Sequence, residues 1–182
     1  MSKDQTDNSY LADKIALRLS MLPQKEILNV VDAFHGKGTI WKNISKKYEG
    51  KIRITKIDIE SKNNNDFVLM GDNKKYLSSL SLKKYDVIDL DAYGVPYDQL
   101  KIVFDRDFKG IVFVTFIQSV MGRLSNGLLN DLGYTDDMID KCPMLLCRNG
   151  KIKFLNWLGL NGVNTITMRS QSRKCYLGFE MK

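Results

Sequence analysis

The sequence predicts an α/β fold in which a mostly parallel, doubly wound sheet ends in an antiparallel hairpin. Through most of the 182 residues, short runs rich in Val, Ile and Phe alternate with segments of helical periodicity, as in parallel sheets covered on both faces. Acidic residues and glycines follow the ends of successive apolar runs, at the edge where such sheets bind ligands. Near the end, residues 163–181 contain two strand-like runs joined by the polar RSQSRK, which favours a hairpin.

The first predicted element is a helix near the N-terminus. Leucine or isoleucine recurs at helical spacing from residue 11 to residue 22. Asn8 or Ser9 is the expected cap of this helix, and Pro23 ends it. Residues 1–8 are expected to form a disordered tail, and residues 9–182 a single domain.

Apolar runs and helical segments then alternate. The predicted strands cover Glu26–Phe34, Arg53–Ile59, Asp66–Asp72, Tyr85–Asp91 and Lys109–Gln118. The predicted helices cover 39–48, 73–80 and roughly 97–104, and the segments 125–142 and 151–160 are helical or mixed. Only seven residues separate Ile59 from Phe67, whereas a parallel crossover usually takes about a dozen or more. Either the connecting helix is reduced to a turn, or a strand boundary lies several residues away.

The composition is that of an ordinary globular protein with an excess of basic residues. The hydrophobic fraction is 43% and the charged fraction 27%, both typical of such proteins. The net charge of +7 favours a polyanionic partner such as nucleic acid. A lysine-rich solvated surface without such a partner explains the charge as well.

No run of residues has the length and apolarity of a membrane helix, and the N-terminus is polar. A cytoplasmic location without membrane association is therefore expected. Cys142, Cys147 and Cys175 lack the paired spacing of zinc ligands, and His35 is the single histidine. We expect reduced thiols and no metal site.

The segment VDAFHGKGT (Val31–Thr39) joins the first predicted strand to a helix. Gly36 and Gly38 allow a tight turn and a close approach of the backbone to a ligand. The pattern D-x-F-x-G-x-G begins with an acid, which would repel a pyrophosphate but would accept a hydrogen bond from an ammonium group. The alternative is an ordinary turn between a strand and a helix.

Two further acids lie at the ends of predicted strands. In IDIE (Ile57–Glu60), Asp58 is the candidate to accept hydrogen bonds from ribose hydroxyls, with Glu60 as the near alternative. In MGDNKKYL (Met70–Leu77), Asp72 is the candidate to accept from an adenine amino group. Each of these acids, taken alone, is equally well explained as a solvated residue at a strand end.

In this order, the motifs between Val31 and Pro96 resemble those of the class I S-adenosylmethionine-dependent methyltransferases, which have a Rossmann-like fold. The resemblance implies S-adenosylmethionine as the cofactor, with Asp58 at its ribose and Asp72 at its adenine. It also implies that the methionine end of the cofactor is lined by Asp32, Phe34, Gly36 and Gly38.

The stretch YDVIDLDAYGVP (Tyr85–Pro96) resembles the fourth-strand motif of the tRNA guanine-N2 dimethyltransferases, in which Asp-Pro-(Tyr/Phe)-Gly is followed shortly by Pro. The resemblance implies that Asp91 accepts from the reacting amine. Asp89 faces the same side of the strand as Asp91, and is either structural or in contact with the cofactor. Ala92 stands where that family has Pro, which leaves open activity on another nucleophile, or none.

The same resemblance places the substrate beside the end of this strand. Tyr93 would stack on the base, unless it is a packed loop aromatic, and Gly94 would leave room for close approach. Pro96 completes the predicted substrate-binding set.

The sequence thus predicts a methyltransferase acting on nucleic acid, with a base amine of RNA favoured over DNA. The alternatives are a methyltransferase for a small molecule or protein, and a non-catalytic cofactor-binding module. The C-terminal domain of the tRNA dimethyltransferases has no counterpart in this sequence, so a partner subunit for target recognition is one further expectation.

Overall fold

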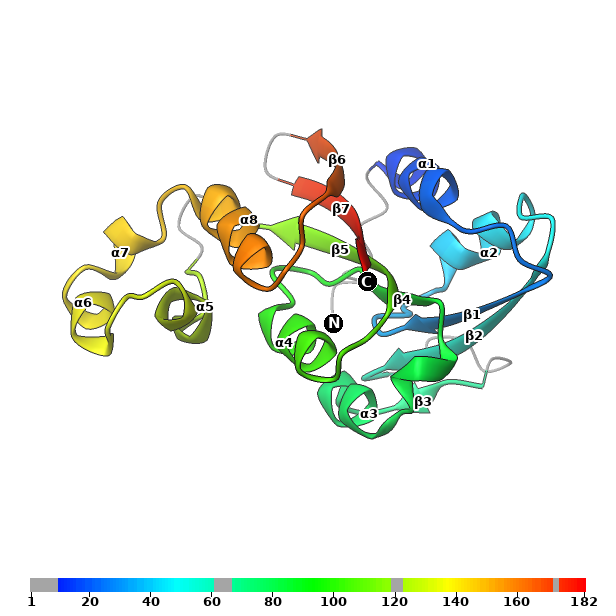
Figure 1. The fold of residues 1–182 in the computed structure, drawn as a ribbon, viewed down its shortest axis with the longest axis horizontal. Coiled ribbons are helices and arrows are strands. Elements are labelled where there is room, and N and C mark those ends of the chain that lie inside the picture. Colours follow the sequence, from blue (N-terminus) through cyan, green and yellow to red (C-terminus); the bar gives the residue numbers. More distant parts are fainter. Residues whose placement is uncertain (1–9, 61–66, 119–122, 172–173) are drawn as a thin grey trace, which may run out of the picture.

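The computed structural model describes residues 10–60, 67–118, 123–171 and 174–182, which form a seven-stranded sheet with helices on both faces (Figure 1). Neighbouring strands are parallel from β3 to β5, whereas β7 is antiparallel to both β5 and β6. The predicted fold, a mostly parallel sheet that ends in an antiparallel hairpin, is confirmed. Across the sheet the strands are β3 (Leu69–Met70), β2 (Lys51–Asp58), β1 (Ile27–Asp32), β4 (Val87–Leu90), β5 (Gly110–Ile117), β7 (Lys174–Met181) and β6 (Ile166–Gln171).

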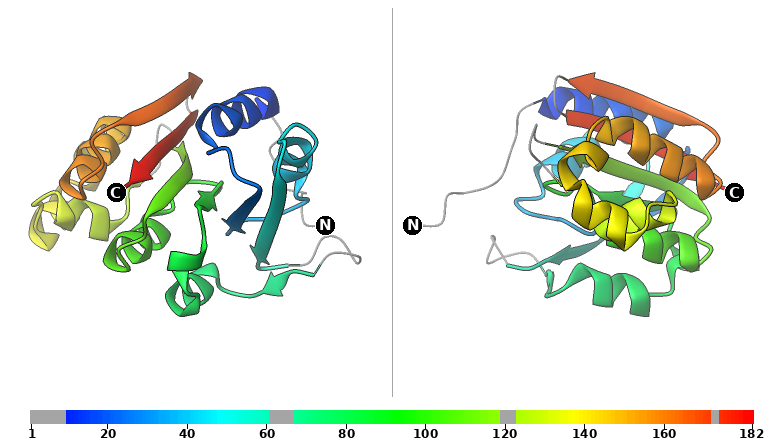
Figure 2. Two further views of the ribbon diagram at one scale, coloured as in Figure 1. Left: turned by 45° about the vertical axis from the view of Figure 1, so that its right-hand side comes forward. Right: turned by 90° about the vertical axis from the view of Figure 1, so that its left-hand side faces the viewer.

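Helices cover both faces of the sheet because successive strand residues point to opposite sides. Val30 belongs to a core formed with α1 and α2, and Val31 to a second core formed with α3, α4 and α8. Figure 2 shows these two helical layers on either side of the strands. The covering helices are α1 (Leu11–Met21), α2 (Thr39–Ser45), α3 (Asn73–Ser79), α4 (Tyr97–Asp105) and α8 (Gly150–Leu160).

Three short helices come before α8 in the sequence. In space they lie on the far side of α8 from β1 and β2 (Figure 1). They are α5 (Asn126–Asp131), α6 (Asp136–Lys141) and α7 (Pro143–Leu146). Ser125 and Thr135 cap α5 and α6 by accepting backbone N–H bonds. The segments predicted as helical or mixed are thus helical, and a 3-10 turn, η1 (Leu82–Lys84), precedes β4. Within the described ranges, every helix is too short or too polar to cross a membrane.

Strand β3 differs most from the prediction, because it covers only Leu69–Met70. It pairs with the last two residues of β2 at the sheet edge, so β2 offers no partner to the residues that follow Met70. Asp72 therefore lies beyond the strand, at the cap of α3. The question of a reduced crossover helix falls largely on residues 61–66, which lie outside the described residues.

The ends of the fold also differ from the prediction in detail. Helix α1 begins at Leu11 after Tyr10 in a left-handed conformation, while the predicted caps and the predicted tail, residues 1–9, lie outside the described residues. In the hairpin, the segment Arg169–Gln171 belongs to β6, although it was expected in the connection. Most of β6 is exposed at the sheet edge, where polar residues are well tolerated.

Candidate functional site

A cavity lies at the carboxyl ends of β1, β2 and β4, the edge at which open α/β sheets bind ligands. Its volume of about 230 Å³ is slightly below the roughly 300 Å³ at which small-molecule pockets begin, so it holds one small ligand or part of a larger one. Of the predicted site residues, those lining the cavity are Asp32, Phe34, Gly36, Gly38, Asp58, Asp89, Asp91 and Tyr93.

The glycine turn after β1 is held by two of the predicted acids. The amide of Gly36 donates to Asp58 Oδ2 at 2.5 Å, and His35 Nδ1 lies 2.8 Å from Asp32 Oδ2. Gly36 and Gly38 have φ values of 54° and 66°, in the left-handed region that favours glycine. At Gly38 a Cβ would also lie 2.5 Å from His35 Cε1. Both glycines are thus required by the backbone, and the second also by the imidazole beneath it.

Asp89 joins β4 to both helices on one face of the sheet. Its carboxylate accepts two hydrogen bonds from Arg18, each 2.7 Å, and one from Trp41 Nε1 at 2.8 Å. Asp89 and Arg18 are both about 1% exposed. Burial raises the pKa of Asp89 to about 6 although Arg18 opposes the shift, and the two hydrogen bonds from the Arg18 guanidinium favour the ionised carboxylate. Burial lowers the pKa of Arg18, but the neighbouring carboxylates, above all Asp89, outweigh this effect and raise it.

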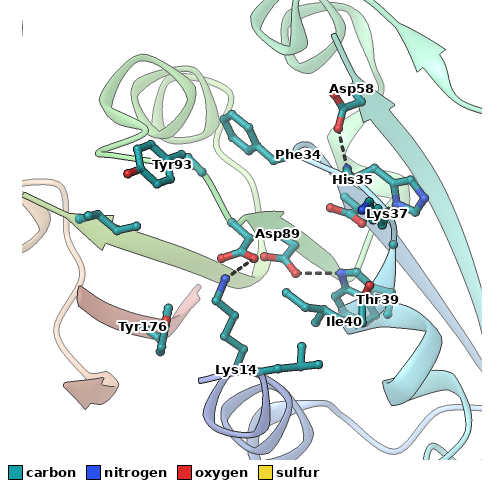
Figure 3. A pocket seen from close by; sticks show the side chains of 18 residues that line it. Lys14, Phe34, His35, Lys37, Thr39, Ile40, Asp58, Asp89, Tyr93 and Tyr176 are labelled. Atoms are coloured by element: carbon teal, nitrogen blue, oxygen red, sulfur yellow. Dashed lines mark hydrogen bonds and ion pairs between the residues drawn. The ribbon is translucent and has the colours of Figure 1, made fainter. Parts of the chain in front are cut away.

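Asp91, one residue beyond β4, is a half-buried acid at this edge. Lys14 of α1 donates to its Oδ2 at 2.8 Å, and the Thr115 hydroxyl donates to its Oδ1. The side chains of Lys14 and Asp91 are 9% and 13% exposed. Figure 3 shows Lys14 reaching from α1 toward the strand ends near Asp89. Burial would raise the pKa of Asp91, but the charges of Arg18 and Lys14 and the two hydrogen bonds hold it below its ordinary value.

The residues after Asp91 form the rim of the cavity. Ala92 is buried, and its amide donates to Leu90 O at 2.8 Å. Gly94 has a φ of 125°, and its carbonyl accepts from Ile117 N. Tyr93 is 73% exposed, and its ring stands beside the cavity in Figure 3. Because it is so exposed, Tyr93 is not a packed loop aromatic.

Three predicted residues do not line the cavity. Asp72 Oδ1 accepts from the amide of Lys74 at 2.9 Å and so caps α3. Gly94 lies beyond the rim, and Pro96 is buried at the start of α4. A contact between Asp72 and adenine, or between Gly94 or Pro96 and a substrate, stays a prediction.

Sequence reasoning missed the contribution of α1. Lys14 and Arg18 are one helical turn apart, on the face that also carries the buried Ile15. Two basic residues within an apolar helix stripe would have been the signal, because buried charges need partners. Thr115 and Tyr176, from β5 and β7, carry no such signal in the sequence.

The described residues contain no cluster of three or more potential metal ligands among His, Cys, Asp and Glu. The three cysteines form no disulfide; Cys142 is exposed, whereas Cys147 and Cys175 are buried.

No protein-family model and no curated protein matches this chain. Solved structures match it in fold. An S-adenosylmethionine-dependent methyltransferase from Archaeoglobus fulgidus is 12% identical with a TM-score of 0.55, and the match covers 93% of each chain. Mitomycin 7-O-methyltransferase MmcR is 13% identical with a TM-score of 0.53, over 96% of this chain and 54% of that one.

A structure of PigF with S-adenosylhomocysteine is 16% identical with a TM-score of 0.51, over 96% of this chain and 56% of that one. Such low identities establish the fold alone. The fold, with strand order β3-β2-β1-β4-β5-β7-β6, is that of class I S-adenosylmethionine-dependent methyltransferases. The resemblance to tRNA guanine-N2 dimethyltransferases stays a prediction.

Proposed function

We propose that this protein is an S-adenosylmethionine-dependent methyltransferase that modifies an amino group of a nucleic-acid base, with RNA favoured over DNA. The observation that carries the proposal is the composition of one cavity. Its wall holds Asp32, the glycine turn and Asp58, predicted for the methyl donor, and also Asp91 and Tyr93, predicted for the acceptor.

The residues present fit S-adenosylmethionine. The cofactor has a sulfonium and an ammonium group, and the cavity is lined by four carboxylates, Asp32, Asp58, Asp89 and Asp91. Asp58 receives one backbone amide on each oxygen, and each oxygen keeps a lone pair for a ribose hydroxyl. Above Gly36 a Cβ would meet nothing nearer than Phe34 O at 4.0 Å, so a ligand has room there. When bound, the cofactor supplies a methyl group on a positively charged sulfur.

At the acceptor end, Asp91 would orient the incoming amine. Lys14 and Thr115 fix its carboxylate from two sides, and each oxygen retains capacity to accept a further N–H. Because the pKa of Asp91 lies below its ordinary value, the group stays ionised and acts as a hydrogen-bond acceptor. Correct orientation alone accounts for much of the acceleration in such a transfer.

A nucleic-acid substrate is supported by two features. The exposed ring of Tyr93 beside the cavity suits stacking on a base that has left its duplex or belongs to a single strand. The net charge of +7 suits a phosphate backbone. Ala92, in place of the Pro of the resembled motif, makes the turn after Asp91 less rigid. Recognition of the target nucleic acid would come in part from a partner subunit.

The cofactor part of the proposal is tested by calorimetry with S-adenosylhomocysteine. Wild-type protein should bind it, and Asp32→Asn should weaken binding by about 30-fold or more, since a buried charged partner is lost. Asp98→Asn, at an exposed ion pair with Lys74, serves as the matched control. Absence of binding by wild-type protein would refute both the nucleic-acid methyltransferase and the methyltransferase for a small molecule or protein.

The substrate part is tested by transfer of a tritiated methyl group to total tRNA, rRNA, DNA and a pool of small metabolites. Label in RNA is the expected result. Label confined to DNA, metabolites or protein would overturn the RNA assignment while keeping the methyltransferase. Calorimetry therefore tests the cofactor and methyl labelling tests the substrate, so that either part of the proposal can fail without the other experiment being needed to show it.

A further inference from the structure

Lys14 is a buried lysine whose ammonium group faces the cavity. It lies on α1, 77 residues from Asp91 in the sequence, and its Nζ is 2.8 Å from Asp91 Oδ2. The same Nζ lies 5.2 Å from the centre of the Tyr176 ring, a distance suited to a cation–π contact. Arg18 Nη1 donates to the Lys14 carbonyl at 3.0 Å. Lys14 is therefore held in place from its backbone and from its tip.

The charges around the cavity create a difficulty for one part of the proposed cofactor. Its amino-acid end carries a carboxylate, which would enter a cavity already lined by four aspartates. A buried anion needs a cation or several donors within hydrogen-bond distance. A positive group among the lining residues would therefore stabilise the cofactor carboxylate.

Within the described part of the chain, the basic residues that line the cavity are Lys14, Lys37 and His35, and His35 Nδ1 already lies 2.8 Å from Asp32 Oδ2. Lys37 is exposed on the glycine turn, where water weakens its electrostatic interactions. Lys14 is buried, and its ammonium group has three N–H donors, of which Asp91 takes one. Arg18 does not line the cavity, and its guanidinium is directed at Asp89 and the Lys14 carbonyl.

We infer that Lys14 binds the α-carboxylate at the methionine end of the cofactor while it keeps its ion pair with Asp91. The inference rests on the proposed function and deepens it, because one side chain then contacts both the methyl donor and the residue that orients the acceptor. Without the ammonium group, the carboxylates of the cofactor and of Asp91 would face each other unscreened.

The test compares two ligands that differ in this carboxylate alone. S-adenosylhomocysteine carries it, and S-adenosyl-3-thiopropylamine, its decarboxylated form, does not. Their affinities are measured by calorimetry with the full chain as wild type, Lys14→Met, Lys14→Arg and Lys37→Met. Lys109→Met is the matched control, since Lys109 also lies 2.8 Å from an aspartate but outside the cavity.

In Lys14→Met the affinity for S-adenosylhomocysteine should fall about 30-fold or more, while the affinity for the decarboxylated ligand changes less than about 3-fold. Lys14→Arg should retain most of the preference for the carboxylate, and Lys37→Met and Lys109→Met should retain all of it. Because any general disturbance of the cavity would weaken both ligands, the ratio of the two affinities isolates the carboxylate contact.

Equal affinities of wild-type protein for the two ligands would overturn the inference without any variant, and so would an unchanged ratio in Lys14→Met. If Lys37→Met loses the preference for S-adenosylhomocysteine over the decarboxylated ligand, the carboxylate contact belongs to Lys37. If wild-type protein binds neither ligand, the proposed function itself fails, and the inference fails with it. If Lys14→Met does not fold, the wild-type ratio and Lys14→Arg still decide the outcome.

Discussion

Asp91 is surrounded by partners that come from distant parts of the chain. Lys14 reaches it from α1 and Thr115 from β5, so each oxygen has its own donor. Such a carboxylate has a fixed orientation, because either donor opposes its rotation. This suits a group that positions a reacting amine rather than one that only carries charge.

For Asp91→Asn we expect methyl transfer to fall by about 10²- to 10⁴-fold, the range for a group that assists proton loss in the transition state. Binding of S-adenosylhomocysteine should change by less than about 3-fold, because the amide carbonyl still accepts from Lys14. Initial rates with the substrate identified by methyl labelling, together with calorimetry, check both parts. Unreduced turnover in a folded variant would exclude Asp91 from catalysis.

The two glycines of the turn after β1 are expected to tolerate alanine differently. Both have positive φ, which costs a residue with a Cβ about 1 kcal/mol or more. At Gly36 the added methyl has space, whereas at Gly38 it would overlap the His35 ring. Gly38→Ala should therefore be destabilised by about 2 kcal/mol more than Gly36→Ala in urea unfolding. Equal losses would show that His35 moves aside without cost.

At the scale of elements, α1 is attached to the sheet by charges as well as by apolar packing. Leu17 is buried against the sheet, and from the same helix Arg18 and Lys14 pair with acids at β4. Ion pairs of this kind depend on geometry, so they specify where the helix lies along the strands. The helix thereby becomes one wall of the cavity.

Arg18→Met tests this attachment. Removing one member of a buried ion pair leaves an uncompensated charge, so we expect a loss of about 3–5 kcal/mol in the free energy of unfolding. Arg106→Met is the control, because the exposed Arg106 donates to the carbonyl oxygens of Ser78 and Leu80, and the change should cost about 1 kcal/mol or less. A loss as small as that of the control would mean that Trp41 alone keeps Asp89 satisfied.

At the scale of the whole molecule, the excess of basic residues is the property that bears on the partner. With a net charge of +7, binding to RNA should be driven largely by release of counterions. The expected slope of log K against log salt is about −0.7 for each phosphate contacted on a single strand. This slope is measured by fluorescence anisotropy with labelled tRNA at about four salt concentrations between roughly 50 and 200 mM. Affinity that does not change with salt, or no binding at the lowest salt, would count against a nucleic-acid substrate.

The sequence by itself determined the fold class and the order of the motifs. Strand and helix periodicities are local properties, so the apolar runs at β1, β4 and β5 could be located with errors of a few residues. The glycine turn and the acids at the ends of β1, β2 and β4 could be located for the same reason. The length of β3 was wrong, because it depends on how far β2 extends beside it.

Only the tertiary structure decided which residues surround Asp89 and Asp91. Arg18 lies 71 residues from Asp89 in the sequence, and Lys14 lies 77 residues from Asp91. No local pattern relates residues so far apart, since their contact exists only once α1 packs against the completed sheet. The sequence therefore determined that carboxylates lie at the end of β4. The packing of α1 decided that Arg18 pairs with Asp89, and that Lys14 both pairs with Asp91 and lines the cavity.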